Sequence, residues 1–252
     1  RFHIFACEQL HGGHADRICR HRKSSPAAYC LSDDTQAREA WQRRLFLRVH
    51  PIGPKLSSLP MPFPAIRDPS PMKVAVVSCS LRAITRSYVL AQDVAERLRE
   101  LGVEVVFHDL RDYDLGLRGS PGAHETEEVR GIVDSLQACD AILVAVPIYC
   151  FDVNAAAKNL IELTGKAWEN KVVGFLCAAG GRASYMSVMP ISNSLMLDFR
   201  CIIIPRFVYA LGDDFENDGT EDMRVGSDAI KERIRELAEA AVRIGGALSD
   251  AT

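Results

Sequence analysis

The sequence contains no apolar run of the roughly 18 residues that a helix needs to cross a bilayer. Residues 1–30 also lack the apolar core of a signal peptide. We therefore expect a soluble protein with no membrane partner. The eight cysteines include no C-x-x-C pair, the spacing of many zinc and dithiol redox motifs. The sequence therefore favours free thiols in a reducing compartment, and we expect a cytoplasmic protein.

The larger part of the chain lacks a surplus of basic residues. Residues 71–252 carry 19 Lys and Arg against 27 Asp and Glu, whereas residues 1–70 carry 11 against 6. Nucleic-acid-binding domains usually present a basic surface, so this deficit argues against a nucleic-acid partner. The change in the sign of the charge also marks a boundary in the chain.

The segment before this boundary shows little sustained hydrophobic periodicity. Seven of the twelve prolines lie between Pro51 and Pro71, which is typical of an extended linker. Several thiols and imidazoles in the segment are candidate metal ligands, but their spacing matches no zinc module, and we expect no metal: Cys7, His11, His14, Cys19 and His21. We predict a poorly structured, Pro-rich extension over residues 1–71 and a functional domain over residues 72–252, and we expect the functional protein to begin at or near Met72.

From Met72 onward, short apolar runs alternate with amphipathic segments. We expect five strands, at Lys73–Ser78, Val103–His108, Ala141–Val146, Val172–Ala178 and Cys201–Tyr209. We expect five helices, at Arg86–Leu101, Glu125–Cys139, Val153–Leu163, Tyr185–Leu197 and Ser227–Leu248. This alternation predicts an α/β fold with a parallel sheet covered on both faces, and five strands suit the order 2-1-3-4-5. Pro205 should place the last strand at an edge, because proline cannot donate to a ladder.

A loop rich in hydroxyl groups follows the first expected strand. It carries Ser80, Arg82, Thr85 and Ser87 and leads into the first expected helix. The first amides of a helix have no internal partners and lie at the positive end of its dipole. Hydroxyls and a forked guanidinium add further donors, so the loop is a candidate site for a phosphate monoester. The other interpretation is that these hydroxyls only cap the helix and solvate a turn.

Two further loops should meet the first one at the carboxyl edge of the sheet. Residues 147–151 read Pro-Ile-Tyr-Cys-Phe, and such a loop can line one side of a flat ring. The alternative is that Tyr149 and Phe151 are core residues that cover the strand end. Gly180 and Gly181 permit close backbone approach, or else form a simple turn. A phosphate on one side and a flat ring on the other describe FMN.

The motifs of residues 73–212 resemble those of the NADPH-dependent FMN reductase family of flavodoxin-like proteins. The phosphate loop of that family commonly reads G-S-L-R-x-x-S-x-S/N, and residues 79–87 read C-S-L-R-A-I-T-R-S. Its second motif reads P-E-Y-N-x-S-x-P-G-x-L-K-N and is matched here by Pro147, Tyr149, Lys158 and Asn159. The chain departs from this motif at four places: Ile148 replaces Glu, Cys150 replaces Asn, Asp152 replaces Ser, and Asn154-Ala155 replaces Pro-Gly. The Gly-Gly pair after the fourth strand is the third match.

The resemblance implies a flavodoxin-like three-layer sandwich with a five-stranded parallel sheet of order 2-1-3-4-5. It implies that the FMN phosphate is held by Ser80, Arg82, Thr85 and Ser87. The ring edge would follow Pro147, Ile148, Tyr149, Cys150 and Phe151, with Gly180 and Gly181 on the other side. No catalytic residue is expected, because the flavin itself accepts the hydride.

The same resemblance implies an oxidoreductase with FMN as cofactor and NAD(P)H as co-substrate. The electron acceptor would be a small molecule, namely a quinone, an azo compound, free flavin or a metal oxyanion. Relatives in the family are usually homodimers or homotetramers, and we expect the same here. Cys79 and Cys150 lie on loops near the expected flavin, and we expect inert thiols because the phosphate dianion opposes a thiolate.

Two other functions remain open from the residues. A flavodoxin-type electron carrier would bind FMN but use protein partners, and the acidic charge of residues 71–252 favours it. Arg82 favours the enzyme, since electron-carrier flavodoxins usually rely on hydroxyls and amides in this loop. A flavodoxin-like module that has lost its flavin is favoured by the departures in the second motif.

Overall fold

The apolar runs form one parallel sheet in the computed structural model, which describes residues 72–249. At its centre β3 (Ala141–Tyr149) pairs with β1 (Lys73–Ser78) on one side and β5 (Val172–Ala178) on the other. Strand β2 (Glu104–Asp109) pairs with the far side of β1, while β6 (Ile202–Ile203) and β7 (Val208–Ala210) pair with β5. The predicted flavodoxin-like order 2-1-3-4-5 is therefore confirmed. The predicted extension over residues 1–71 lies outside the described residues.

The fifth predicted strand, Cys201–Tyr209, is wrong in one respect, because it is interrupted. It forms the two short strands β6 and β7, with residues 204–207 between them. Pro205 has no N–H to donate, and Arg206 adopts a positive φ of 61°, so the chain leaves the ladder there. Within residues 72–249 both short strands pair with β5 alone, which confirms the predicted edge position.

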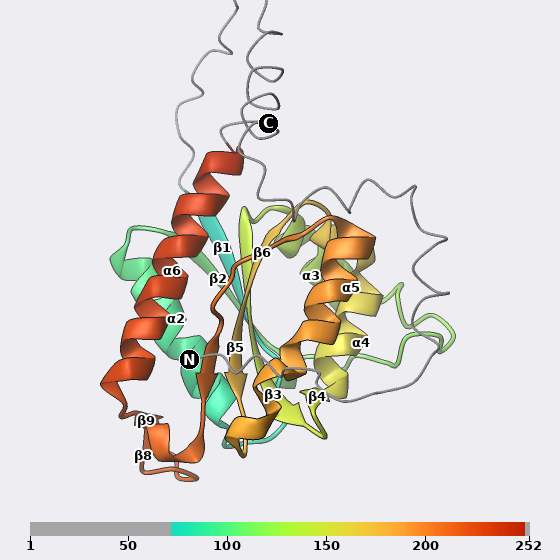
Figure 1. Ribbon diagram of the computed structural model, residues 1–252. Coiled ribbons are helices and arrows are strands. Elements are labelled where there is room, and N and C mark those ends of the chain that lie inside the picture. The colour runs from blue at the N-terminus through green and yellow to red at the C-terminus, as the bar shows by residue number, and fades with distance from the viewer. Residues whose placement is uncertain (1–71, 250–252) are drawn as a thin grey trace, which may run out of the picture. The chain divides into compact units, whose positions relative to one another are not determined.

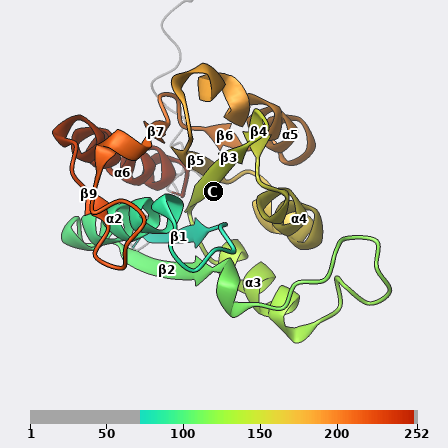
Figure 2. The same ribbon diagram turned by 90° about the horizontal axis from the view of Figure 1, so that it is seen from below.

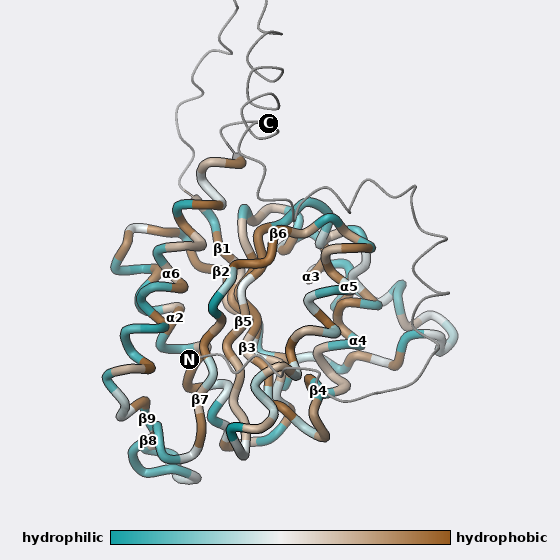
Figure 3. The backbone as a smooth tube through the Cα atoms, in the orientation of Figure 1, coloured by the Kyte–Doolittle hydropathy of each residue, from teal (hydrophilic) through white to brown (hydrophobic). Residues whose placement is uncertain are grey.

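Helices cover both faces of the sheet (Figures 1 and 2). One face packs against α2 (Arg86–Glu100) and α6 (Asp228–Ser249), and the other against α3 (Glu127–Gln137), α4 (Ala155–Thr164) and α5 (Met189–Phe199). Strand β1 shows the alternation: Val74 and Val76 face the first pair of helices, and Ala75 and Val77 face the other three. All four residues are fully buried, as expected for a strand covered on both faces. The hydrophobic colouring of the central strands in Figure 3 follows this core.

The helix predicted over Tyr185–Leu197 begins differently from the expectation. The chain first forms the 3-10 helix η6 (Arg182–Val188) and then the α-helix α5. A proline, Pro190, lies in the first turn of α5, where its missing N–H has no helical partner to lose. Proline in a helix interior would remove one bond and clash with the preceding turn, so regular α-helix starts here and not at Tyr185.

Short elements lie at the ends of the main strands and helices. The remaining strands are β4 (Asp152–Val153), β8 (Phe215–Glu216) and β9 (Arg224–Val225). The remaining 3-10 helices are η4 (Leu110–Asp112), η5 (Gly165–Trp168) and η7 (Gly212–Asp214). None of the helices within residues 72–249 is long and apolar enough to cross a membrane.

Candidate functional site

The loops after β1 and β3 are joined directly at the carboxyl edge of the sheet. The backbone N–H of Cys79 donates to the carbonyl oxygen of Ala145 at 2.9 Å. The side-chain amide of Asn154, at the start of α4, donates to the carbonyl oxygen of Cys79 at 2.6 Å. These two bonds fix the start of the loop after β1 against both β3 and α4. Sequence reasoning missed Asn154, although asparagine is a preferred residue before a helix and its position was therefore readable.

The predicted phosphate residues surround the start of α2. Ser80 and Ser87 are buried, Thr85 is half-buried and Arg82 is exposed. The hydroxyl oxygens of Thr85 and Ser87 lie 3.0 Å apart, and the backbone N–H of Arg82 donates to the Ser80 hydroxyl at 3.4 Å. We call residues 79–85 the β1–α2 loop. The structure thus brings the hydroxyls of Thr85 and Ser87 together, while the Ser80 hydroxyl bonds within the loop and the Arg82 side chain lies at the surface.

The N-terminus of α2 has the properties of an anion site. Thr85 precedes it with an extended backbone (φ −155°, ψ 135°), and its side chain does not cap the helix. No acidic residue lies in the first turn of this 15-residue helix. The first amides therefore keep their donors and their positive partial charge for a ligand.

Two buried polar atoms near this loop have no partner. They are the Ser78 hydroxyl oxygen, at the end of β1, and the Asn154 Oδ1, and no other buried side-chain oxygen or nitrogen within residues 72–249 lacks one. A buried unsatisfied group costs about 1–3 kcal/mol, so such groups are rare in folded proteins. Both residues lie at the start of the β1–α2 loop, because Ser78 precedes Cys79 and Asn154 bonds to Cys79, and this position is consistent with a ligand site and not with a helix cap alone.

The loop after β3 is a tight hairpin turn in a strained conformation. Strands β3 and β4 pair through Tyr149 and Asp152, leaving Cys150 and Phe151 as the two turn residues. Both have positive φ, 52° and 60°, as in a type I′ turn that normally carries Asn or Gly. Left-handed backbone at two such residues costs of order 1–3 kcal/mol each and is concentrated at functional sites. Tyr149 and Phe151 are 47% and 68% exposed, so the alternative in which they are core residues is wrong.

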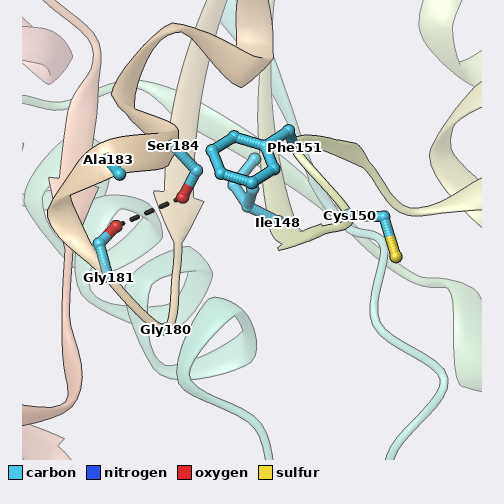
Figure 4. Close-up of a pocket in the computed structure, with 7 residues that line it drawn as sticks. All are labelled: Ile148, Cys150, Phe151, Gly180, Gly181, Ala183 and Ser184. Carbon is cyan, nitrogen blue, oxygen red and sulfur yellow. Dashed lines mark hydrogen bonds between the residues drawn. The ribbon is translucent and has the colours of Figure 1, made fainter.

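A pocket of about 260 Å³ opens between this hairpin and the loop after β5. Figure 4 shows the lining residues, with Ile148, Cys150 and Phe151 on one side and Gly180, Gly181, Ala183 and Ser184 on the other. A Cβ placed on Gly180 or Gly181 would meet no atom within 4 Å, and neither glycine has a positive φ. The backbone therefore does not require glycine here, and the missing side chains leave open space above the loop.

The predicted ring residues are only partly brought together. Ile148, Cys150, Phe151, Gly180 and Gly181 line the pocket. Pro147 is buried within β3, where its carbonyl accepts the backbone N–H of Asn154 at 3.2 Å, and Tyr149 is exposed beside the pocket. Ala183 and Ser184 were missed, although a hydroxyl residue three positions after a Gly-Gly pair at a strand end was a usable signal. The residues of the β1–α2 loop form a separate group and do not line this pocket.

The two thiols predicted to lie near the site differ sharply in accessibility. Cys79 is fully buried, and burial raises the pKa of its thiol far above the ordinary value. Cys150 is exposed and lines the pocket. The expectation of an inert thiol therefore has a physical basis at Cys79, whereas at Cys150 it stays a prediction.

Comparison with known proteins gives consistent matches. The family model described as NADPH-dependent FMN reductase matches residues 72–216. An FMN reductase (NADPH) from Pseudomonas aeruginosa is 29% identical over 184 residues, which is 72% of this chain and 96% of the relative. An NAD(P)H-dependent FAD/FMN reductase from Geobacillus thermodenitrificans is 25% identical over 171 residues, which is 66% of this chain and 90% of the relative.

A solved structure has the same fold. It is the flavoenzyme NAD(P)H:(acceptor) oxidoreductase FerB from Paracoccus denitrificans, with a TM-score of 0.56 and 19% identity. The match covers 70% of this chain and 98% of that protein. At this identity the likeness supports the architecture of residues 72–249 and carries no residue role.

Proposed function

Because the chain belongs to the NADPH-dependent FMN reductase family, whose model matches more than half of it, we propose that the β1–α2 loop and the pocket are the two ends of one FMN site. The protein is an NAD(P)H-dependent oxidoreductase with FMN as cofactor. The single observation that carries the placement is that the uncapped start of α2, with the paired hydroxyls of Thr85 and Ser87, and the glycine-walled pocket lie at the same carboxyl edge of the parallel sheet.

At the phosphate end, this chain supplies hydrogen-bond donors and little negative charge. The hydroxyls of Ser80, Thr85 and Ser87 and the first amides of α2 would hold the phosphate oxygens. Arg82, exposed at the surface, would add a charged donor from the solvent side. The geometry suits a dianion because the first turn of α2 carries no carboxylate.

At the ring end, the chain supplies shape and backbone groups. The open space above Gly180 and Gly181 would let a flat ring lie against the backbone. The hairpin of Cys150 and Phe151 would line the opposite side, with Ile148 at the base of the pocket. When bound, FMN supplies the hydride acceptor, so the protein needs to orient it and leave one face open.

The proposal also concerns the identity of the electron acceptor. We infer a small molecule that enters the pocket after the oxidised nucleotide leaves, and free flavin is the first candidate because both curated relatives are named as flavin reductases. Quinones, azo compounds and metal oxyanions are the other candidates. A homodimer or homotetramer in the cytoplasm stays part of this proposal.

Anaerobic reduction tests the proposed function. The purified protein, reconstituted with FMN, should absorb as oxidised flavin and bleach when NADPH is added, and each acceptor that the enzyme uses should restore the colour. A protein that takes up FMN but is not bleached by NADPH or NADH would instead be an electron carrier. A protein that cannot take up FMN would contradict the proposal altogether.

A further inference from the structure

One side chain contacts the β1–α2 loop from outside the proposed phosphate site. The Nη1 of Arg111, which lies in η4 directly after β2, donates to the carbonyl oxygen of Ala83 in the loop at 2.6 Å. The contact joins residues 28 positions apart in the sequence. Arg111 is therefore a link between the end of the neighbouring strand and the middle of the loop.

The other nitrogens of Arg111 are bound as well. Its Nε donates to Oδ2 of Asp109 at 2.8 Å, its Nη2 contacts the same oxygen, and its backbone N–H donates to Oδ1 at 3.1 Å. Asp109 is only 6% exposed and ends β2 in register with Ser78, the last residue of β1. The Arg111 guanidinium carbon also lies 4.2 Å from the ring centroid of Tyr88, in the first turn of α2. A carboxylate, a carbonyl and an aromatic ring thus fix one guanidinium.

This arrangement has two consequences for an anion in the loop. The Ala83 carbonyl is turned towards Arg111, and in a trans peptide the following N–H, that of Ile84, points the opposite way. Arg111 therefore sets the direction of a loop amide. It also neutralises Asp109, a largely buried carboxylate next to the loop that would otherwise repel a phosphate dianion.

We propose that Arg111 is a positioning residue for the FMN phosphate, acting through the Ala83 carbonyl and the charge of Asp109 and making no contact with the cofactor. The proposal rests on the proposed FMN site. It assigns to Arg111 a selectivity for phosphorylated flavin: its loss should weaken the binding of FMN and leave that of riboflavin, which has no phosphate, nearly unchanged.

The test compares two ligands on three variants. Dissociation constants for FMN and riboflavin are measured by quenching of flavin fluorescence for wild type, Arg111→Gln, Arg111→Lys and the control Arg97→Gln. Arg97 is a surface residue of α2 that pairs with Glu100 at 2.8 Å, away from the loop. Circular dichroism and the melting temperature show which variants are folded, and Arg111→Lys keeps the charge if Arg111→Gln does not fold.

The expected result is a loss of selectivity. Arg111→Gln removes the charged hydrogen bond to the Ala83 carbonyl and leaves the Asp109 carboxylate without its charge partner. It should therefore weaken FMN binding about tenfold or more, with less than a twofold change for riboflavin. Lysine has no forked guanidinium, so it cannot bond Asp109 and the Ala83 carbonyl together in the same way. The FMN affinity of Arg111→Lys should therefore lie between those of Arg111→Gln and wild type. Arg97→Gln should match wild type for both ligands.

The outcomes separate this inference from the proposed function. If wild type prefers FMN and the folded Arg111 variants keep the same ratio of the two affinities, the positioning role is wrong and the FMN site stands. If both affinities fall equally, Arg111 has a purely structural role. If wild type binds FMN and riboflavin equally, both the site and the role of Arg111 are contradicted.

Discussion

The phenolic hydroxyl of Tyr209 donates a hydrogen bond of 2.6 Å to the carbonyl oxygen of Gly181. The hydroxyl oxygen of Ser184 lies 2.7 Å from the same phenolic oxygen, and the Ser184 hydroxyl also lies 3.2 Å from the Gly181 carbonyl oxygen, which accepts from it. Tyr209 belongs to β7, so the edge strand holds the loop that forms one wall of the pocket. The Tyr185 ring packs against Tyr209 with their centroids 5.2 Å apart and adds to this support.

The substitution Tyr209→Phe should loosen the pocket wall without disturbing the core. It keeps the ring and removes both hydrogen bonds, so we expect flavin to bind about 3–10-fold more weakly, the equivalent of one net hydrogen bond. The matched control is Tyr113→Phe, which likewise keeps the ring and removes a bond of 2.7 Å to His108, at a residue that does not line the pocket. Titration of each variant with FMN measures the effect, and wild-type affinity in Tyr209→Phe would show that the wall does not depend on this bond.

The substitution Gly180→Ala tests the open space over the glycine wall. A Cβ there meets no protein atom within 4 Å and no positive φ opposes it, so the melting temperature should not fall. The methyl group would project into the space proposed for the ring, so FMN binding should weaken at least about tenfold through overlap with the ligand.

A control for this substitution lies in α6. Gly246 is also surrounded by open space, and Gly246→Ala should stabilise the helix by about 0.5–1 kcal/mol without any effect on flavin binding. Equal flavin affinities in Gly180→Ala and wild type would place the ring elsewhere.

The order of the strands could be predicted because it depends on local patterns. The fully apolar stretch of β1 and the alternation of strands and helices need no knowledge of distant contacts, and Pro205 by itself indicated an edge. The break between β6 and β7 was missed: Pro205 indicated only that the strand could not be central, and the positive φ of Arg206, which helps the chain leave the ladder there, appears only in the folded chain.

The residues that support the site could not be predicted from the sequence, because their contacts form only in the folded chain. Arg111 contacts Ala83 and Tyr209 contacts Gly181, each across 28 positions, so no motif includes both partners. The ligand-facing residues were readable because they lie together on three loops, but the pairing of each loop with its support is a product of the tertiary structure.

Thiol labelling should distinguish the two cysteines near the site. Cys150 is exposed and should be labelled by iodoacetamide in the folded protein, and bound FMN should protect it because it lines the pocket. Cys79 is buried with a raised pKa and should stay unlabelled in the folded protein. Peptide mass spectrometry after timed labelling measures both. Rapid labelling of Cys79, or no protection of Cys150 by FMN, would contradict the arrangement.

Stability should fall at mildly acidic pH because of His108. Its ring nitrogens lie 2.7 Å from the Tyr113 hydroxyl and 2.8 Å from the Ser135 hydroxyl, and burial lowers its pKa below the ordinary value of 6.5. The unfolded chain therefore takes up a proton at a higher pH than the folded protein does. The contribution of His108 to stability is complete above the pKa that this histidine has in the unfolded chain, and it is lost as the pH falls below that pKa.

Urea denaturation between pH 7.5 and 5.5 measures this effect, in a range above the titration of ordinary carboxylates. The free energy of unfolding of wild type should decrease more steeply with falling pH than that of His108→Gln. Parallel pH profiles for the two proteins would show that His108 does not contribute.

The most direct test of the FMN site is the ratio of the affinities of wild-type protein for FMN and riboflavin, measured by fluorescence titration together with Ser87→Ala. A phosphate held by several hydroxyls and helix amides should make FMN bind at least about 100-fold more tightly than riboflavin, and Ser87→Ala should reduce that ratio. Equal affinities for the two flavins in wild type would contradict a phosphate site at the start of α2.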